Sequence, residues 1–88
     1  MDFTNLEFEV EYVLNRQPTI VFARQITPGD FHMTEQATLG GCPVSPNISM
    51  PRAHDSAGKQ RFDLFAFVLL SGADRTKFTI GQRIELRP

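Results

Sequence analysis

The clearest pattern in the chain is a regular alternation of apolar and acidic residues near its beginning. The apolar positions are Leu6, Phe8, Val10, Tyr12 and Leu14. The acidic positions between them are Glu7, Glu9 and Glu11. Successive side chains of a strand point to opposite faces, so this pattern predicts a half-buried strand with its glutamates in solvent.

Two more segments in the first half are rich in β-branched and aromatic residues, which favour strands. Thr19–Ile26 predicts a second strand and Phe31–Leu39 a third. Between them, Thr27–Asp30 predicts a turn, because proline presets its φ angle and glycine accepts a positive one. Gly40 and Gly41 end the third strand and predict another turn.

The second half contains one long apolar segment and several chain breaks. Prolines between residues 42 and 51 limit any strand there to a short or edge piece, for which Ile48–Arg52 is the best candidate. His54–Gln60 is polar and predicts an exposed loop. Residues 62–70 become apolar on both faces after Asp63, which predicts a central strand buried on two sides.

The last segment predicts a short helical turn followed by a strand. Asp74 is placed to cap a single turn over Arg75–Phe78, and Arg83–Arg87 predicts the final strand. So short a helix cannot hold itself together, since helix nucleation is costly. Phe78 is the only large apolar side chain between residues 72 and 80, so we expect it to plug one end of the fold.

No segment shows the apolar stripe of a helix over three turns. The pattern therefore predicts an all-β protein, a small six-stranded closed β-barrel with at most one short helical turn. Closure into a barrel is the economical way to hide the edges of short strands. At 88 residues, the chain predicts a single domain over residues 1–88.

Composition excludes several classes of protein. A net charge of −1 with 22% charged residues excludes a disordered tail or a strongly basic nucleic-acid arm. One cysteine excludes a disulfide within the chain. The longest apolar run, Leu64–Leu70, is far shorter than the ~20 residues that span a bilayer. With no leader pattern at the first residues, we expect a cytoplasmic protein without membrane contact.

Two stretches resemble the second domain of translational GTPases, the β-barrel that follows the GTP-binding domain in elongation factor Tu and its relatives. Residues 19–29, TIVFARQITPG, are similar to the family's pair of β-residues, a small residue, a basic residue and an apolar residue, followed by a turn ending in glycine. Residues 67–88, FVLLSGADRTKFTIGQRIELRP, are similar to its closing pattern of strand, glycine, one-turn helix, glycine and strand ending in proline. The resemblance implies this barrel fold, here as a stand-alone domain.

The resemblance does not carry over every property of the family. The sequence has no Gly-x-x-x-x-Gly-Lys-Ser/Thr loop, so binding of GTP is not expected. Ser49 and Phe65 stand where the family's aminoacyl-tRNA pocket has Glu and Asn, whereas Arg52 matches a family Arg. The resemblance therefore implies the fold and a binding role, and leaves aminoacyl-tRNA binding without two of its matched residues.

Motifs for catalysis or metal binding are weak. His54-Asp55-Ser56 cannot form a nucleophilic triad, because side chains of consecutive residues diverge. His32, His54 and Cys42 lack the spacing of zinc ligands, and Cys42 fits a small apolar residue at a strand end. We therefore expect no enzyme activity, no metal and no cofactor.

The remaining candidate surface is basic. Its members are Arg52, Lys59, Arg61, Arg75 and Lys77. We expect a non-enzymatic binding module whose ligand or protein partner the sequence does not reveal. One alternative is an RNA- or tRNA-contacting domain that uses this basic rim, with Phe65 and Phe67 either stacking bases or packing inward. Another is a self-associating structural protein, because residues 1–51 are acidic and residues 52–88 are basic.

Overall fold

The computed structural model describes residues 6–51, 54, 56–61 and 63–88, and they form one antiparallel sheet. The strands are β1 (Leu6–Leu14), β2 (Ile20–Gln25), β3 (Thr38–Leu39), β4 (Cys42–Pro43), β5 (Leu64–Val68) and β6 (Arg83–Arg87). Their order across the sheet is β4-β3-β6-β1-β2-β5. A 3₁₀ helix, η1 (Gly72–Lys77), is the one helix in the described part of the chain. The prediction of an all-β protein with a single short helical turn is confirmed.

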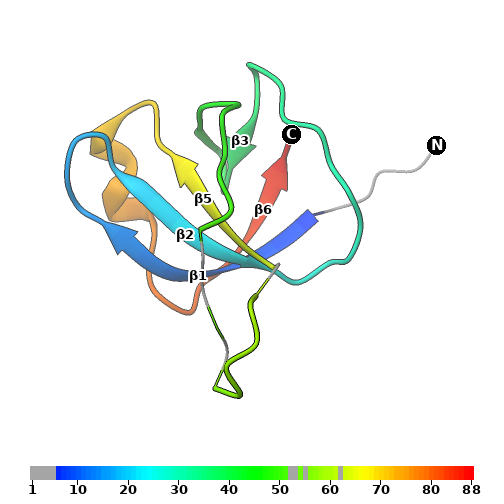
Figure 1. Cartoon of the computed structure of the whole chain (residues 1–88). Coiled ribbons are helices and arrows are strands. Elements are labelled where there is room, and N and C mark those ends of the chain that lie inside the picture. Colours follow the sequence, from blue (N-terminus) through cyan, green and yellow to red (C-terminus); the bar gives the residue numbers. More distant parts are fainter. Residues whose placement is uncertain (1–5, 52–53, 55, 62) are drawn as a thin grey trace.

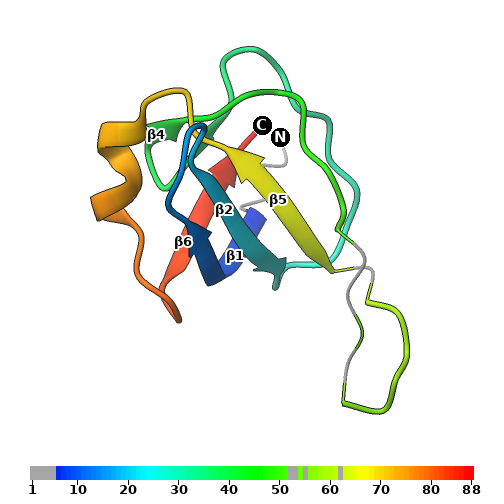
Figure 2. The ribbon, with the colours of Figure 1, turned by 60° about the vertical axis from the view of Figure 1, so that its left-hand side comes forward.

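The sheet curls into a half-barrel (Figures 1 and 2). Where its two outer strands approach each other, the Ser45 amide donates to the Val68 carbonyl at 2.8 Å. The Leu70 amide donates to the Pro43 carbonyl at 3.2 Å, and Val44 forms an isolated bridge with Leu69. We call this contact between residues 43–45 and 68–70 the edge contact. It joins the end of β5 to the chain that leaves β4.

The core lies on the concave side of the sheet and is dominated by aromatic rings. Phe8 and Phe67 are fully buried, and their ring centroids lie 5.3 Å apart in an edge-to-face arrangement. Phe31 and Phe65 contact Phe8 in the same way, at 5.8 and 5.9 Å. Such pairs add about 0.5–1.5 kcal/mol beyond the burial of their area. Phe65 and Phe67 therefore pack inward, which was one of the two alternatives predicted for these residues.

The alternation of β1 changes phase at a β-bulge. The register shifts between Val10 and Tyr12, so Glu11 is the extra residue. Beyond it Val13 faces the core, opposite Val21, and Tyr12 is turned outward with 53% of its surface exposed. The prediction that Tyr12 and Leu14 share the buried face of Val10 is therefore wrong, because one inserted residue reverses the alternation.

Two predicted strands are much shorter than expected. Only Thr38–Leu39 of the predicted strand Phe31–Leu39 pairs with the sheet. Phe31 and Met33 pack against the core from a loop, whose backbone then turns with Ala37 donating to the Thr34 carbonyl. The apolar side chains of Phe31 and Met33 predict a strand because the core needs them. The backbone that carries them forms no ladder with the sheet.

The predicted strand Ile48–Arg52 is reduced to one isolated bridge between Ser49 and Ala66. The two residues exchange backbone hydrogen bonds of 2.8 and 3.3 Å. Prolines on either side cannot donate to a ladder, which limits the pairing. Arg52 lies outside the described residues.

The predicted strand over residues 62–70 is observed as β5 (Leu64–Val68). Its two-sided burial is confirmed for the described residues, since Phe67 lies in the core while Leu64 and Ala66 are buried on the opposite face. The strand occupies the end of the sheet order rather than its centre, which corrects the prediction of a central strand. Phe62 lies outside the described residues.

Gly40 and Gly41 form the two-residue turn that joins β3 to β4. Their φ angles of 59° and 84° are both positive, which is the geometry of a type I′ hairpin turn. Gly40 also lies against β6, because a Cβ atom added there would be 3.3 Å from Cγ2 of Ile84. The prediction of a turn at this pair is confirmed.

Helix η1 begins after Ser71, whose side chain makes no capping hydrogen bond. The prediction that Asp74 caps the helix is wrong, since Asp74 lies inside it and its carboxylate pairs with Lys77 at 3.4 Å. Phe78 follows the helix, is only 8% exposed and belongs to the core cluster. The expected burial of Phe78 is therefore confirmed.

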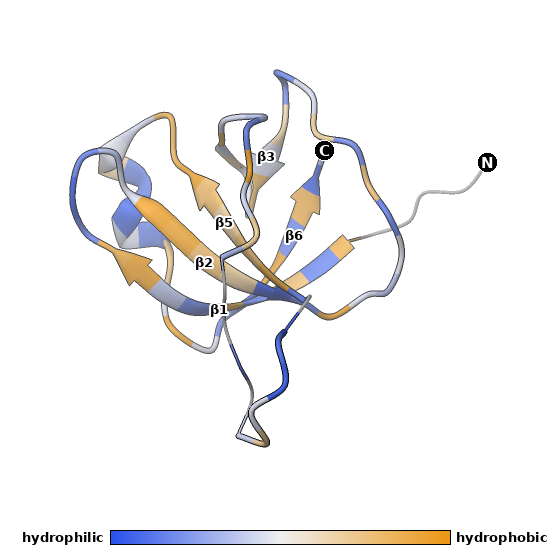
Figure 3. Ribbon diagram, in the orientation of Figure 1, coloured by the Kyte–Doolittle hydropathy of each residue, from blue (hydrophilic) through white to orange (hydrophobic). Residues whose placement is uncertain are grey.

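In Figure 3 the ribbon of η1 is coloured mostly as hydrophilic, whereas β2 and β5 are coloured mostly as hydrophobic. The described residues contain no helix with the length and apolar character needed to cross a membrane.

Candidate functional site

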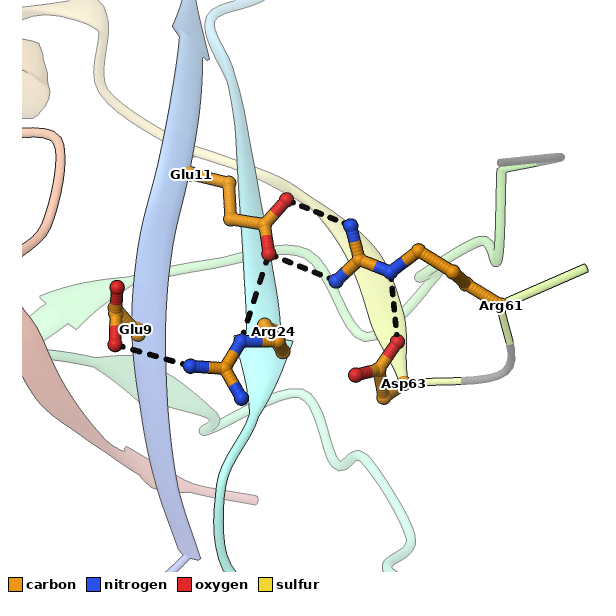
Figure 4. Close-up of polar contacts among 5 residues, drawn as sticks. All are labelled: Glu9, Glu11, Arg24, Arg61 and Asp63. Carbon is orange, nitrogen blue, oxygen red and sulfur yellow. Dashed lines mark hydrogen bonds and ion pairs between the residues drawn. The ribbon is translucent and has the colours of Figure 1, made fainter. Parts of the chain in front are cut away.

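Arg61, a member of the predicted basic rim, is the centre of an ion-pair network on the outer face of the sheet (Figure 4). Its two terminal nitrogens donate to the two carboxylate oxygens of Glu11, at 2.9 and 2.7 Å. Its Nε donates to Asp63 at 3.0 Å. On the other side of Glu11, Arg24 lies 3.6 Å from it and 3.1 Å from Glu9.

The network shifts the acidity of its central pair. Hydrogen bonds from Arg61 lower the pKa of the Glu11 carboxyl, although partial burial acts in the opposite direction. The same hydrogen bonds raise the pKa of the Arg61 guanidinium. With only 20% of its side chain exposed and carboxylates on both sides, Arg61 presents little uncompensated charge to a ligand.

Arg52 lies outside the described residues, and the other rim residues that the structure describes do not all lie near Arg61. Lys59 is exposed in the loop before it, while Arg75 and Lys77 lie on η1, which is well separated from that loop in Figures 1 and 2. Lys77 pairs with Asp74. The structure therefore brings the predicted rim residues together in part only: Lys59 with Arg61, and Arg75 with Lys77.

The residues considered for catalysis or metal binding are dispersed. His54 and Ser56 are exposed loop residues, and Asp55 lies outside the described residues. Within residues 6–51, 54, 56–61 and 63–88, no three His, Cys, Asp or Glu side chains lie close enough to hold a metal ion. Cys42 is buried, and this burial raises the pKa of its thiol, with a smaller effect of Asp74 in the same direction.

The structure shows a groove of about 710 Å³ that the sequence did not predict, at the end of the sheet where β2 leaves and β5 enters. We call it the aromatic groove. The residues that define its character are Asp30, Phe31, His32, Ile48, Met50 and Phe65. Phe31 and Phe65 form its floor, with ring centroids 5.4 Å apart, and Met50 lies exposed on its edge.

The turn after β2 forms the polar rim of the aromatic groove, and the side chain of Gln25 holds this turn in place. The amide nitrogen of the Gln25 side chain donates to the carbonyls of Thr27 and Gly29, at 2.7 and 2.8 Å. This fixes the turn that carries Asp30. Among the described residues, the Asp30 carboxylate has no ion-pair or hydrogen-bond partner. The rim therefore offers an unpaired negative charge beside two aromatic rings.

The sequence held one signal for this groove. Phe31 and Met33 are large apolar residues in an otherwise polar stretch after the Thr27–Asp30 turn. Such a pattern is typical of a loop that folds back over the core. The same residues also fit a strand, and a strand prediction does not bring this loop together with Ile48 and Phe65.

No protein-family model, curated protein or solved structure matches the chain. The function is therefore inferred from the geometry of this chain alone.

Proposed function

We propose that this protein is a non-enzymatic binding module that takes an Arg or Lys side chain of a partner protein in the aromatic groove. The observation that carries the proposal is the unpaired Asp30 carboxylate on the rim of a groove floored by Phe31 and Phe65. A cation attached to an apolar stem fits such a lining, because its charge meets the carboxylate while its stem and head contact the rings.

We also propose that the curled sheet closes at the edge contact into a six-stranded barrel, similar to the second domain of elongation factor Tu. The edge contact supports closure, because it supplies backbone hydrogen bonds between the two ends of the strand order. Closure would leave the aromatic groove at one rim of the barrel, which is a common place for a binding site in small barrels.

The two alternatives from the sequence receive less support. An RNA contact through the basic rim requires free cations gathered on one surface. Arg61 and Lys77 pair with carboxylates of the same chain, and Arg75 lies on η1, well separated from the loop that carries Lys59. Self-association through the acidic first strand requires free glutamates. Glu7, Glu9 and Glu11 lie beside Arg83, Arg24 and Arg61 of the same chain.

Selection from a random peptide display library tests the proposed function. We expect the selected peptides to share an Arg or Lys next to an apolar residue, and their binding to weaken by about tenfold in Asp30→Asn, the loss of one charged contact. Met50→Ser should weaken them as well, since Met50 is exposed on the groove's edge. Glu35→Gln, an exposed acid that does not line the groove, is the matched control.

Two results would contradict the proposal. One is a selection that enriches no Arg- or Lys-containing motif. The other is a selected peptide that binds Asp30→Asn and Met50→Ser as tightly as it binds the parent.

A further inference from the structure

A second groove, with a volume of about 790 Å³, lies between the β1–β2 turn and η1. Among the described residues, it has no lining residue in common with the aromatic groove. We call it the arginine groove, because Arg16 lines it from the turn and Arg75 from the helix. Leu70, Gln17 and Thr76 are also among its lining residues.

Both arginines carry charges that no described residue neutralises. The ion pairs of the described residues engage Arg24, Arg61, Lys77, Arg83 and Arg87. Arg16 and Arg75 have none there, and no described Asp or Glu lines their groove. The nearest acid along η1, Asp74, has a side chain only 17% exposed and pairs with Lys77.

The backbone under both arginines is fixed by buried neighbours. The hydroxyl of Thr19, which is buried, donates to the Arg16 carbonyl at 3.2 Å, and the Leu69 amide donates to the Thr19 carbonyl at 3.0 Å. On the other wall, the Phe78 amide donates to the Arg75 carbonyl. The walls also meet, since a Cβ atom on Gly72 would lie 3.8 Å from the Thr19 hydroxyl. The backbone at both arginines is therefore held by hydrogen bonds, and both residues line the same groove.

The lining combines charge with an apolar surface. Leu70 is 62% exposed, so the groove places an apolar side chain in solvent beside two cations. Guanidinium groups bind carboxylates and phosphates through paired hydrogen bonds, which lysine cannot reproduce. A ligand that combines an oxyanion with an apolar body would use both parts of the lining.

We propose that the arginine groove binds an oxyanion joined to an apolar group, with Arg16 and Arg75 holding the anion and Leu70 contacting the apolar part. The oxyanion is a carboxylate or a phosphate, and the test below distinguishes the two. This inference is independent of the proposed function, because no residue that the structure describes lines both grooves.

Titration of the ¹⁵N-labelled full chain at constant ionic strength tests the inference. The probes are phenyl phosphate, phenylacetate and inorganic phosphate, with sodium chloride as the blank. We expect saturable shifts at the amides of Gln17, Gly72 and Thr76. Phenyl phosphate should bind more tightly than inorganic phosphate, and whichever of the two organic anions binds more tightly identifies the oxyanion.

Variants then locate the site. Arg16→Gln and Arg75→Gln should each weaken the better organic anion by about tenfold, and Arg75→Lys should fall short of the parent. Leu70→Ser should remove the advantage of phenyl phosphate over inorganic phosphate. Arg87→Gln removes an exposed arginine of β6 that does not line the groove, and should bind like the parent.

The inference is overturned if no probe gives saturable shifts at these amides. It is also overturned if Arg16→Gln and Arg75→Gln, with parent-like spectra elsewhere, bind as tightly as Arg87→Gln. Equal binding of phenyl phosphate and inorganic phosphate to the parent would refute the apolar half of the site.

Discussion

Glu11 and Arg61 lie 50 residues apart in the sequence, and both nitrogens of the Arg61 fork bind the two oxygens of the Glu11 carboxylate. Glu11 is also the residue inserted at the β-bulge, between the paired positions Val10 and Tyr12. The bulge reverses the alternation of β1 beyond Glu11, and the Glu11 carboxylate joins β1 to the chain that enters β5.

We expect Glu11→Gln to reduce stability in a pH-dependent way. The folded-state pKa of Glu11 is lowered from 4.5, chiefly by hydrogen bonds from Arg61. A carboxyl with a lowered pKa stabilises the fold above its unfolded pKa, and this contribution is lost as the pH falls through the folded value. Denaturant unfolding should therefore show a deficit for Glu11→Gln near neutral pH that shrinks below pH 4.5. A deficit of constant size across this range would contradict the prediction; Glu35→Gln serves as control.

Phe78→Ala should destabilise the protein severely. Phe78 is 8% exposed, and loss of a buried phenyl ring costs about 3–5 kcal/mol. Denaturant unfolding measures the free-energy difference. Lys77→Ala, the exposed neighbour, should cost no more than about 0.5 kcal/mol, as surface substitutions usually do. Equal stability of Phe78→Ala and the parent would show that the ring does not anchor the chain after η1.

Gly40→Ala should cost more than Gly41→Ala. Both glycines have positive φ angles, so alanine brings a backbone strain of roughly 1–2 kcal/mol at either position. Only at Gly40 does the added methyl group also press on Ile84, 3.3 Å away. The difference between the two unfolding free energies isolates this close approach. Identical losses would mean that β6 yields to the methyl group without cost.

Cys42 should react with thiol reagents only as the protein unfolds. The side chain is 2% exposed, and burial raises the pKa of the thiol, so the reactive thiolate is scarce in the folded state. Labelling with Ellman's reagent across a urea series should follow the unfolding curve. Labelling at the same rate in buffer and in urea would contradict the prediction.

The sequence predicted strands well where side-chain periodicity and backbone pairing agree. Arg83–Arg87 was predicted with its observed bounds, and Ile20–Gln25 lies one residue inside its predicted range at each end. The prediction was wrong where side-chain periodicity and backbone pairing differ. Phe31 and Met33 are needed by the core but stand on a loop. The alternation of acidic and apolar residues runs through Glu11 to Tyr12, so it does not mark the bulge at Glu11.

The grooves were beyond the sequence for a different reason. Each is made by segments distant in the chain: the turn after β2 with Ile48 and Phe65, or the β1–β2 turn with η1. Charge in the sequence does not show which cations find partners. Arg61 was predicted to be free for a ligand and is paired with Glu11. Arg16 was not part of the predicted basic rim and has no ion-pair partner among the described residues.

The edge contact is the part of the sheet where we expect local opening to begin. Residues 43–45 and 68–70 are joined by a few backbone hydrogen bonds, and β3 and β4 beside them are two residues long, whereas β1 pairs with β2 along most of its length. Local opening begins where few bonds must break at once. The amides of Ser45 and Leu70 should therefore exchange with solvent deuterium before those of β1 and β2. An opening of this kind would expose the interior of the sheet while its longest strands stay paired.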